Sequence, residues 1–205
     1  MNFRRIFYTV STVVLIGCQQ DSIAVFDHQA QYDIDKVLID EYLETHSYDA
    51  TNDVFKDLED GEIALKSDDN LINYKDTVNE VAYDMYSYVT VTGTQENPDS
   101  NDIVNIAYQL TTLDDESSVI EESNTNDGFI SLSNTIEGWQ VGMAAFKGGE
   151  VDETDPTTPR QFFNSGKGFL IIPSGLAYRN LGSGGVAPNK NLIFKITLRT
   201  VTQVD

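Results

Sequence analysis

Cysteine and histidine are both scarce in this chain. The sequence contains one cysteine, Cys18, and two histidines, His28 and His46. A single cysteine excludes a disulfide within the chain, and no Cys/His set has the spacing of a zinc site. A nucleophile elbow and a glycine-rich phosphate loop are missing too. The sequence therefore predicts no metal site and no cofactor.

Positively charged residues are also few. The 205 residues include 13 Lys and Arg but 33 Asp and Glu, which gives a formal net charge of -20. Nucleic-acid binding needs a basic face toward the phosphates, and adsorption on anionic lipid needs basic clusters, so neither is expected. We interpret the excess acid as a solvated surface that keeps the protein soluble. A length of 205 residues is enough for one or two domains, and 40% hydrophobic residues are enough to form a core.

No hydrophobic run is long enough to span a bilayer comfortably. The run IFYTVSTVVLIG covers only residues 6–17. It follows the basic segment MNFRR, and this order is typical of a secretory signal. The run ends in Leu15, Ile16 and Gly17 directly before Cys18, a pattern that resembles the lipobox of bacterial lipoproteins.

The lipobox resemblance implies that residues 1–17 are removed as a signal peptide and that Cys18 is acylated. Several acyl chains on one residue give stable membrane anchoring. Residues 18–26 would then be a tether, and Gln19 suits sorting to the outer membrane, facing the periplasm. The alternative is an ordinary signal peptide in which the cysteine stands by chance.

The segment at residues 27–80 is predicted to be a small helical N-terminal part. In DIDKVLIDEYLETH, residues 33–46, Asp33 can cap a helix. The apolar residues that recur at helical spacing are Ile34, Val37, Leu38 and Tyr42. Residues 49–80 are acidic and weakly patterned, so the sequence indicates no particular element there.

The C-terminal part, residues 81–205, alternates strand patterns with one short helix. Apolar residues alternate with polar ones in DIVNIAYQLTT (102–112) and NLIFKITLRTV (191–201), which is typical of half-buried antiparallel strands. AYDMYSYVTVTG (82–93) favours strand by composition, and GFLIIP (168–173) is a strand that is apolar on both sides.

The helix is predicted in TIEGWQVGMAAFKGGE, residues 135–150. Asn134 or Thr135 can cap it, and Gly148 with Gly149 can end it. Its apolar stripe consists of Trp139, Met143 and Phe146. A sheet crossed by one short helix is an α+β fold.

Three motifs of this C-terminal part resemble FKBP-type peptidyl-prolyl isomerases. They are IEGWQVGM at residues 136–143, IPSGLAY at 172–178, and GSGGVAP at 182–188 followed by NLIF at 191–194. The resemblance implies a curved antiparallel β-sheet wrapped around a short α-helix, with an aromatic pocket between them. It also implies catalysis of proline isomerisation in proline-containing polypeptides.

The resemblance places a set of residues in that pocket. Trp139 forms its floor, Tyr178 and the backbone amide of Ile136 donate hydrogen bonds to peptide carbonyls, and Phe129 supplies a further wall. Many active family members carry Phe-Asp after the first long strand, and that aspartate faces the twisted carbonyl. This chain has Ile120 and Glu121 there, so the resemblance implies that Glu121 stands in for the aspartate. By this resemblance the catalytic residues are Tyr108, Glu121, Ile136, Trp139, Tyr178 and Phe194, and the further substrate-binding residues are Phe129 and Val186.

The chain also departs from the family by an insertion, VDETDPTTPRQFFNSGK, at residues 151–167. Phe162 and Phe163 lie inside this otherwise polar loop. They either cover the core locally or form an exposed apolar patch for a partner.

Three functional hypotheses follow. The first is an active prolyl isomerase that is anchored by lipid in the cell envelope and assists folding. The second is a binding or chaperone module with little catalysis, on the same scaffold. The third is an acidic lipoprotein in which that scaffold has no active pocket. The layout resembles lipoproteins of Bacteroidota, some of which accompany outer-membrane secretion or gliding machinery.

Overall fold

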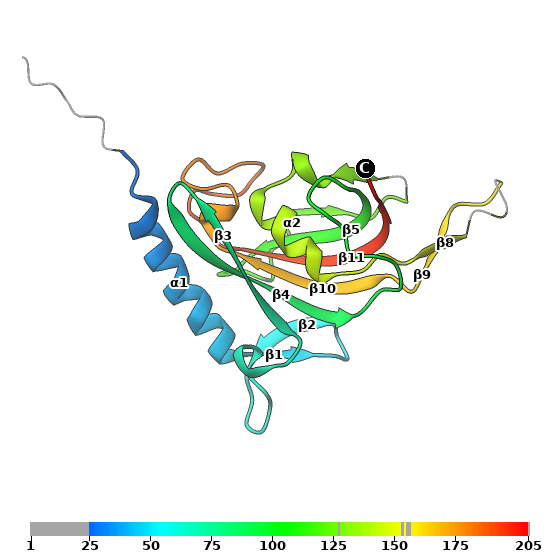
Figure 1. Cartoon of the computed structure of the whole chain (residues 1–205). Helices are drawn as coiled ribbons and strands as arrows, with labels where there is room; N and C mark the ends of the chain where they lie inside the picture. The colour runs from blue at the N-terminus through cyan, green and yellow to red at the C-terminus, as the bar shows by residue number, and fades with distance from the viewer. Residues whose placement is uncertain (1–24, 127, 153, 155–156, 205) are drawn as a thin grey trace, which may run out of the picture.

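The architecture is a curled seven-stranded antiparallel sheet with one short helix on its concave face. The computed structural model describes residues 25–126, 128–152, 154 and 157–204. The strand order is β3-β4-β10-β11-β5-β6, with β7 also paired to β5 (Figure 1). The strands are β3 (Leu71–Val78), β4 (Val81–Val91), β5 (Ile103–Thr112), β6 (Glu121–Ser123), β7 (Phe129–Ser131), β10 (Gly166–Ile172) and β11 (Leu192–Thr202). The α+β class and the curved sheet expected from the sequence are confirmed.

The central strand β10 is buried on both faces, as its continuous apolar run predicts. Leu170 and Ile172 belong to the main core, which holds the helix α2 (Glu137–Gly142). Phe169 and Ile171 point to the opposite face and belong to a second core. Because successive strand side chains alternate between faces, an apolar strand of this kind needs cover on both sides.

The second core is covered by the helix α1 (His28–Thr45) and by a small hairpin of β1 (His46–Asp49) and β2 (Val54–Asp57). Figure 1 shows α1 along one side of the sheet and the hairpin beneath it. The buried side chains of α1 are Tyr32, Asp35, Ile39, Tyr42 and Leu43. The N-terminal segment is therefore packed onto the sheet rather than being a separate body.

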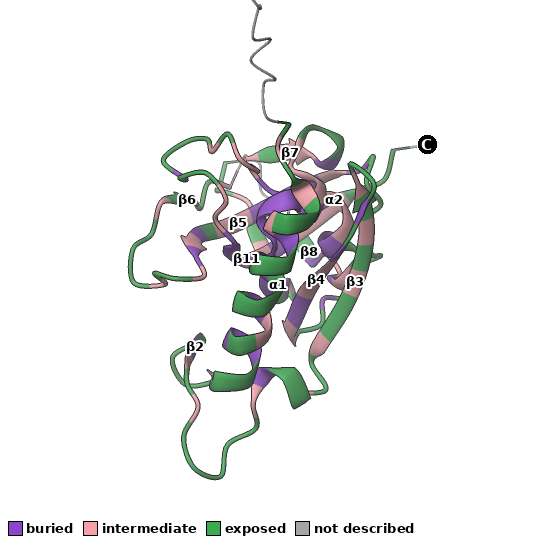
Figure 2. Ribbon diagram, turned by 90° about the vertical axis from the view of Figure 1, so that its left-hand side faces the viewer, coloured by how far each residue is buried: buried purple, intermediate pink, exposed green. Residues whose placement is uncertain are grey.

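The sequence prediction for this helix was wrong in two respects. The helix begins six residues earlier than expected, and Asp27 rather than Asp33 caps it by accepting a hydrogen bond from Ala30 N at 2.9 Å. The predicted apolar stripe is right only for Tyr42, which is 5% exposed, whereas Ile34 is 56% exposed, Val37 64% and Leu38 48%. In Figure 2 the side of α1 that faces away from the sheet is largely exposed. The side of α1 that packs on the sheet carries Tyr32 and Ile39, and it also includes the carboxylate of Asp35.

Residues 27–80 are helical only in α1 and in the 3₁₀ turn η1 (Leu65–Ser67). The expectation of a helical segment up to residue 80 is corrected by β1, β2 and β3. All eight residues of β3 pair with β4, so β3 extends the main sheet. Its weak sequence pattern has a physical reason: β3 is an edge strand, and none of its residues is fully buried.

The insertion at residues 151–167 forms most of a two-stranded arm, β8 (Glu150–Asp152) paired with β9 (Gln161–Phe163). It projects from the sheet in Figure 1. Phe162 is partly buried beneath the Arg199 guanidinium, 5.1 Å from the ring centre, whereas Phe163 is 51% exposed. Phe163 is thus exposed as the second alternative expects, whereas Phe162 packs against Arg199 and belongs to neither core.

The predicted signal peptide and Cys18 lie outside the described residues, as does most of the tether. Among the helices of the described ranges, none is both long enough and apolar enough to cross a membrane.

A buried carboxylate fastens α1 to the sheet. Asp35 is fully buried, and its carboxylate accepts hydrogen bonds from Ser174 N at 3.0 Å and Ser174 Oγ at 2.5 Å. Gln31 Nε2 donates a third, at 2.8 Å. Burial raises the pKa of Asp35 above its ordinary value, and the bonds from Ser174 oppose that rise. Ser174 begins the 3₁₀ turn η4 (Ser174–Leu176), so α1 is tied directly to the segment that follows β10.

Replacing Asp35 with alanine is expected to lower the free energy of unfolding by about 2 kcal/mol, because the buried Ser174 hydroxyl loses its acceptor and Ser174 N keeps only its bond to Asn191 Oδ1. Urea denaturation measures the loss. Asp33→Ala is the control, since Asp33 is exposed on the same helix and should change stability by under about 0.5 kcal/mol.

The raised pKa of Asp35 also fixes how this loss depends on pH. The folded state binds the Asp35 proton more tightly than the unfolded chain, whose carboxyl titrates near 3.8. The stability that Asp35 contributes is therefore complete below that value and declines as the pH rises through the folded pKa. A loss at neutral pH larger than the loss near pH 4 would contradict this account.

Candidate active site

The helix α2 begins without a side-chain cap. Its N-cap residue is Ile136, and the predicted capping by Asn134 or Thr135 does not occur. Thr135 Oγ1 instead donates to the Leu132 carbonyl at 2.6 Å, within the turn that precedes the helix. Only Thr135 separates this turn, η2 (Leu132–Asn134), from the N-cap of α2.

The helix is also shorter than predicted. It continues as the 3₁₀ turn η3 (Met143–Ala145), and Phe146 is already extended, two residues before Gly148. The predicted apolar stripe is nevertheless confirmed, since Trp139, Met143 and Phe146 are all buried.

The close approach of α2 to β10 explains why a glycine, Gly138, directly precedes Trp139. A Cβ atom on Gly138 would lie 2.4 Å from Ile172 Cγ2, well inside van der Waals contact. The missing side chain lets α2 lie directly on β10, and Trp139 is then held 4% exposed between the helix and the sheet.

Three aromatic rings meet at this point. The Trp139 ring contacts those of Tyr108 and Phe194 edge-on, with centroids 5.2 Å apart in both cases and interplanar angles of 89° and 81°. Tyr108 lies on β5 and Phe194 on β11, adjacent strands whose register pairs Tyr108 with Ile196. Edge-to-face packing of this kind is favourable and fixes ring orientation.

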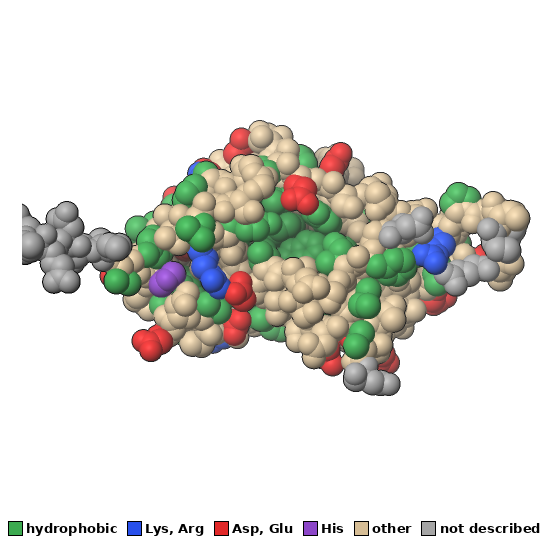
Figure 3. Space-filling model, turned by 90° about the horizontal axis from the view of Figure 1, so that it is seen from above, with side chains coloured by type: hydrophobic (Ala, Val, Ile, Leu, Met, Phe, Trp, Pro, Cys, Tyr) green, Lys and Arg blue, Asp and Glu red, His purple; other side chains and the backbone are tan. Residues whose placement is uncertain are grey.

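The rings border a cavity of about 220 Å³. Seen from above, hydrophobic side chains gather in a hollow at the middle of the molecule (Figure 3). The lining consists of Tyr108, Glu121, Ile130, Asn134, Thr135, Ile136, Trp139, Tyr178 and Phe194. The structure thus brings together the residues predicted as catalytic from five separate parts of the chain. It adds Ile130, Asn134 and Thr135, which the sequence reasoning missed as lining residues.

Two of the predicted substrate-binding residues lie elsewhere. Phe129 is 49% exposed, with the Arg160 guanidinium 5.4 Å from its ring centre, so the expectation of a wall from Phe129 is corrected. Ile130 takes that place, because neighbouring side chains on β7 point to opposite faces. Val186 is 6% exposed and packs in the main core rather than against the cavity. Its loop is closed by hydrogen bonds exchanged between Ser183 and Val186.

Glu121 supplies the only charged side chain of the lining. The Tyr108 hydroxyl donates a short hydrogen bond to Glu121 Oε1. Burial raises the pKa of Tyr108, and this hydrogen bond to Glu121 raises it further. Burial likewise raises the pKa of Tyr178, with a smaller contribution from the Glu121 charge. Both phenols are therefore firmly protonated donors at neutral pH.

Two hydrogen-bond donors at the cavity are unused. Within the described part of the chain, neither the Tyr178 hydroxyl nor the Ile136 backbone N–H has an acceptor. The buried Trp139 Nε1 also has no partner among these residues. A mostly apolar cavity with a few unpaired donors at its border suits an uncharged peptide segment that presents carbonyl oxygens.

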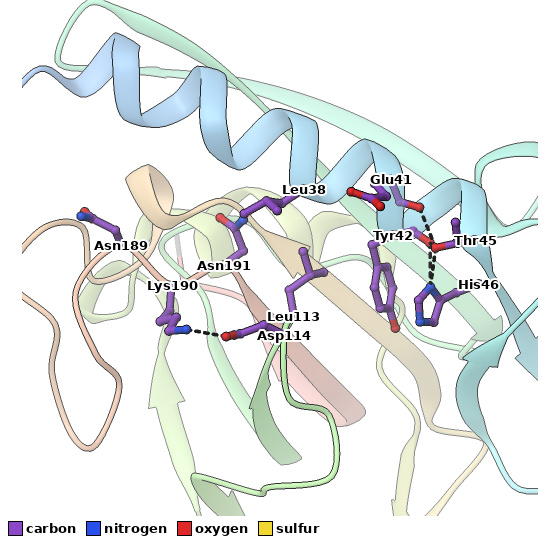
Figure 4. Close-up of a pocket in the computed structure, with 10 residues that line it drawn as sticks. All are labelled: Leu38, Glu41, Tyr42, Thr45, His46, Leu113, Asp114, Asn189, Lys190 and Asn191. Atoms are coloured by element: carbon purple, nitrogen blue, oxygen red, sulfur yellow. Dashed lines mark hydrogen bonds and ion pairs between the residues drawn. The ribbon is translucent and has the colours of Figure 1, made fainter.

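A larger cavity, of about 460 Å³, lies between α1 and the ends of β5 and β11 (Figure 4). Its lining includes Leu38, Tyr42 and Leu113, and an ion pair joins Lys190 to Asp114 at its border. None of the residues predicted as catalytic lies there. The Tyr42 hydroxyl in its lining has no partner among the described residues, but the three converging aromatic rings are missing there, so we place the candidate site at the smaller cavity.

Replacing Gly138 with alanine should lower the free energy of unfolding by about 1–3 kcal/mol, because the added methyl forces α2 away from β10. Trp139 is the only tryptophan, so urea denaturation followed by its fluorescence reports both the stability and the environment of the ring. Ala144→Ser, which adds one atom at an exposed position of η3, should leave both unchanged. An unchanged midpoint for Gly138→Ala would show that the contact with Ile172 relaxes freely.

The chain was compared with known proteins. A curated relative, the probable FKBP-type peptidyl-prolyl cis-trans isomerase FkpA of Neisseria meningitidis serogroup B, is 30% identical over 182 residues, covering 86% of this chain. The chain spans only 57% of the length of that relative.

Among solved structures, a peptidyl-prolyl cis-trans isomerase from Pseudomonas syringae pv. tomato aligns with a TM-score of 0.53 at 18% identity. The alignment covers 88% of this chain and 99% of that one, and it supports the fold alone. The sequence pattern that defines FKBP-type peptidyl-prolyl cis-trans isomerases matches residues 94–199, which hold the whole aromatic cavity. The chain therefore belongs to the FKBP-type peptidyl-prolyl cis-trans isomerase family.

Proposed function

We propose that this chain catalyses cis–trans isomerisation of X-Pro bonds in polypeptides. The observation that carries the proposal is the aromatic cavity with two unused donors at its border. Turning an X-Pro bond breaks amide resonance and meets a barrier of about 18–20 kcal/mol. A catalyst therefore has to bind the twisted amide more tightly than the planar one.

The cavity favours the twisted amide through its apolar surface. A proline ring stacks on Trp139, with Tyr108 and Phe194 beside it. The planar amide carries resonance polarity that water solvates, and the twisted amide has lost much of it. Moving the bond into an apolar cavity therefore costs the planar form more than the twisted form.

The donors hold the chain on either side of the turning bond. The Tyr178 hydroxyl and the Ile136 N–H donate to peptide carbonyl oxygens, so the flanking segments stay in place while the bond rotates. Glu121 acts through Tyr108: by accepting the phenol proton's hydrogen bond, it fixes the ring at the cavity wall. No covalent step and no cofactor enters this mechanism.

The test is isomerisation of a proline tetrapeptide by the purified chain. Tyr178→Phe and Trp139→Leu are each expected to lower kcat/KM about tenfold, equivalent to about 1.4 kcal/mol of transition-state stabilisation. Tyr48→Phe is the control, because Tyr48 packs in the second core and donates to Asp53. A folded wild-type chain that leaves the isomerisation rate unchanged would rule out the enzymatic role.

We further propose that the chain is a lipoprotein of the cell envelope, anchored through Cys18 in the outer membrane and facing the periplasm. The support is the sequence alone: a basic start, an apolar run and a small residue before the single cysteine. There it would assist the folding or assembly of envelope or secreted proteins.

Cys18→Ser should move the protein from the membrane fraction to the soluble fraction and abolish labelling by a radioactive fatty acid. Ser22→Ala, four residues further on, should change neither. Fatty-acid labelling that persists in Cys18→Ser would disprove anchoring at this position.

A second candidate role is a binding or chaperone subunit of an outer-membrane secretion or gliding complex, with little catalysis. The β8–β9 arm favours it, because Phe163 is 51% and Val151 36% exposed on a projecting element. Wild-type chain that binds proline peptides without turning them over would favour this role over the first.

A further inference from the structure

The residue after Tyr178 has an unusual backbone conformation. Arg179 has a φ of 54°, in the left-handed region that favours glycine and disfavours long side chains. Such a conformation persists only where the surrounding contacts impose it, and it is common at functional sites. The contacts of Arg179 therefore indicate what this conformation achieves.

Arg179 is held by both its backbone and its side chain. Its N–H donates to the Ser174 carbonyl at 2.9 Å, and its carbonyl accepts from Asn189 N at 2.8 Å. Its Nε donates to the Gly175 carbonyl at 3.1 Å. Its Nη2 forms an ion pair with Glu137 Oε1 at 2.5 Å. The guanidinium thus ties the loop that carries Tyr178 to the first residue of α2.

The two halves of this ion pair stand next to the two unused donors. Arg179 follows Tyr178, and Glu137 follows Ile136. Tyr178 and Ile136 both line the cavity. The pair therefore joins the two segments that carry these lining residues, and it limits how far the Tyr178 hydroxyl and the Ile136 N–H can move apart.

The ion pair itself contributes little to folding. The side chains of Arg179 and Glu137 are 31% and 37% exposed, and pairs in such surroundings are weakened by water and by salt. The β-sheet and the cores would form without it. A residue in a disfavoured conformation that adds little stability is better explained by the geometry it imposes on its neighbours.

We propose that Arg179 and Glu137 are positioning residues for proline isomerisation. Their ion pair fixes the spacing between the Tyr178 hydroxyl and the Ile136 N–H, so that both donors reach the substrate carbonyls at once. This inference rests on the proposed function. Neither residue touches the substrate; each acts through its neighbour in the chain.

The test compares kcat and KM for a proline tetrapeptide between wild type and three variants. Arg179→Asn keeps a residue that tolerates the left-handed backbone but loses the pair. Glu137→Gln removes the charge from the other half. Each is expected to lower kcat about fivefold to tenfold with little change in KM or thermal stability. Arg179→Lys, which restores the charge without the forked geometry, should recover part of the loss.

The matched control is a comparable ion pair away from the cavity. Lys75 Nζ lies 2.8 Å from Asp84 Oδ1 on β3 and β4, and Lys75→Gln should leave kcat unchanged. The salt dependence of kcat separates positioning from a purely structural role. High salt should lower the kcat of wild type toward that of Arg179→Asn and leave the kcat of Arg179→Asn unchanged. Wild-type kcat in folded Arg179→Asn would overturn the inference.

Peptide binding separates failure of this inference from failure of the proposed function. Trp139 is the only tryptophan and lines the cavity, so its fluorescence follows binding without turnover. If wild type fails to isomerise the peptide, the proposed function fails, and the positioning role of the Arg179–Glu137 ion pair is then judged by peptide binding alone. Weaker binding by Arg179→Asn than by wild type supports that role. Equal binding, or none by wild type, overturns it.

Discussion

The close approach of α2 to the sheet is the constraint on which the rest of the structure depends. Gly138 lies against Ile172, and Gly142 lies against Met85 and Leu170, with no room for a Cβ at either position. Only a helix with bare backbone on that face can lie so near the central strands. This contact determines how deeply Trp139 is buried between the helix and the sheet. The position of the Trp139 ring in turn determines where the cavity ends between Tyr108 and Phe194.

The central strands of the sheet need cover on both faces. Because β10 and β11 carry apolar side chains on both faces, α2 can cover only one of them. The helix α1 and the β1–β2 hairpin cover the other, and the buried carboxylate of Asp35 orients α1 through Ser174. Ser174 starts the turn that leads to Tyr178, so the N-terminal segment and the cavity share one connection. The segment before residue 81 is thus part of the same packed unit.

Much of this could be predicted from the sequence, and the failures have identifiable causes. Alternation in β11 and the continuous apolar run of β10 are strong local signals, and the motifs around Trp139 and Tyr178 placed both on one cavity. The phase of α1 could not be read, because its outer side is also apolar and its inner side includes Asp35. The partner of Asp35 is Ser174, 139 residues away, which no local pattern reveals. The family resemblance implied a wall from Phe129, whereas strand alternation on β7 turns Ile130 toward the cavity.

The edge strand β3 has a consequence for how copies of this protein behave together. Its eight residues pair with β4 on one side only, so within the described sheet the other side leaves backbone donors and acceptors to water. An open edge of this length invites strand pairing between molecules. A chain with a formal net charge of -20 repels its own copies at long range. The acidic surface therefore keeps copies apart and so protects the edge strand from pairing between molecules. Raising the ionic strength screens this repulsion and removes the protection.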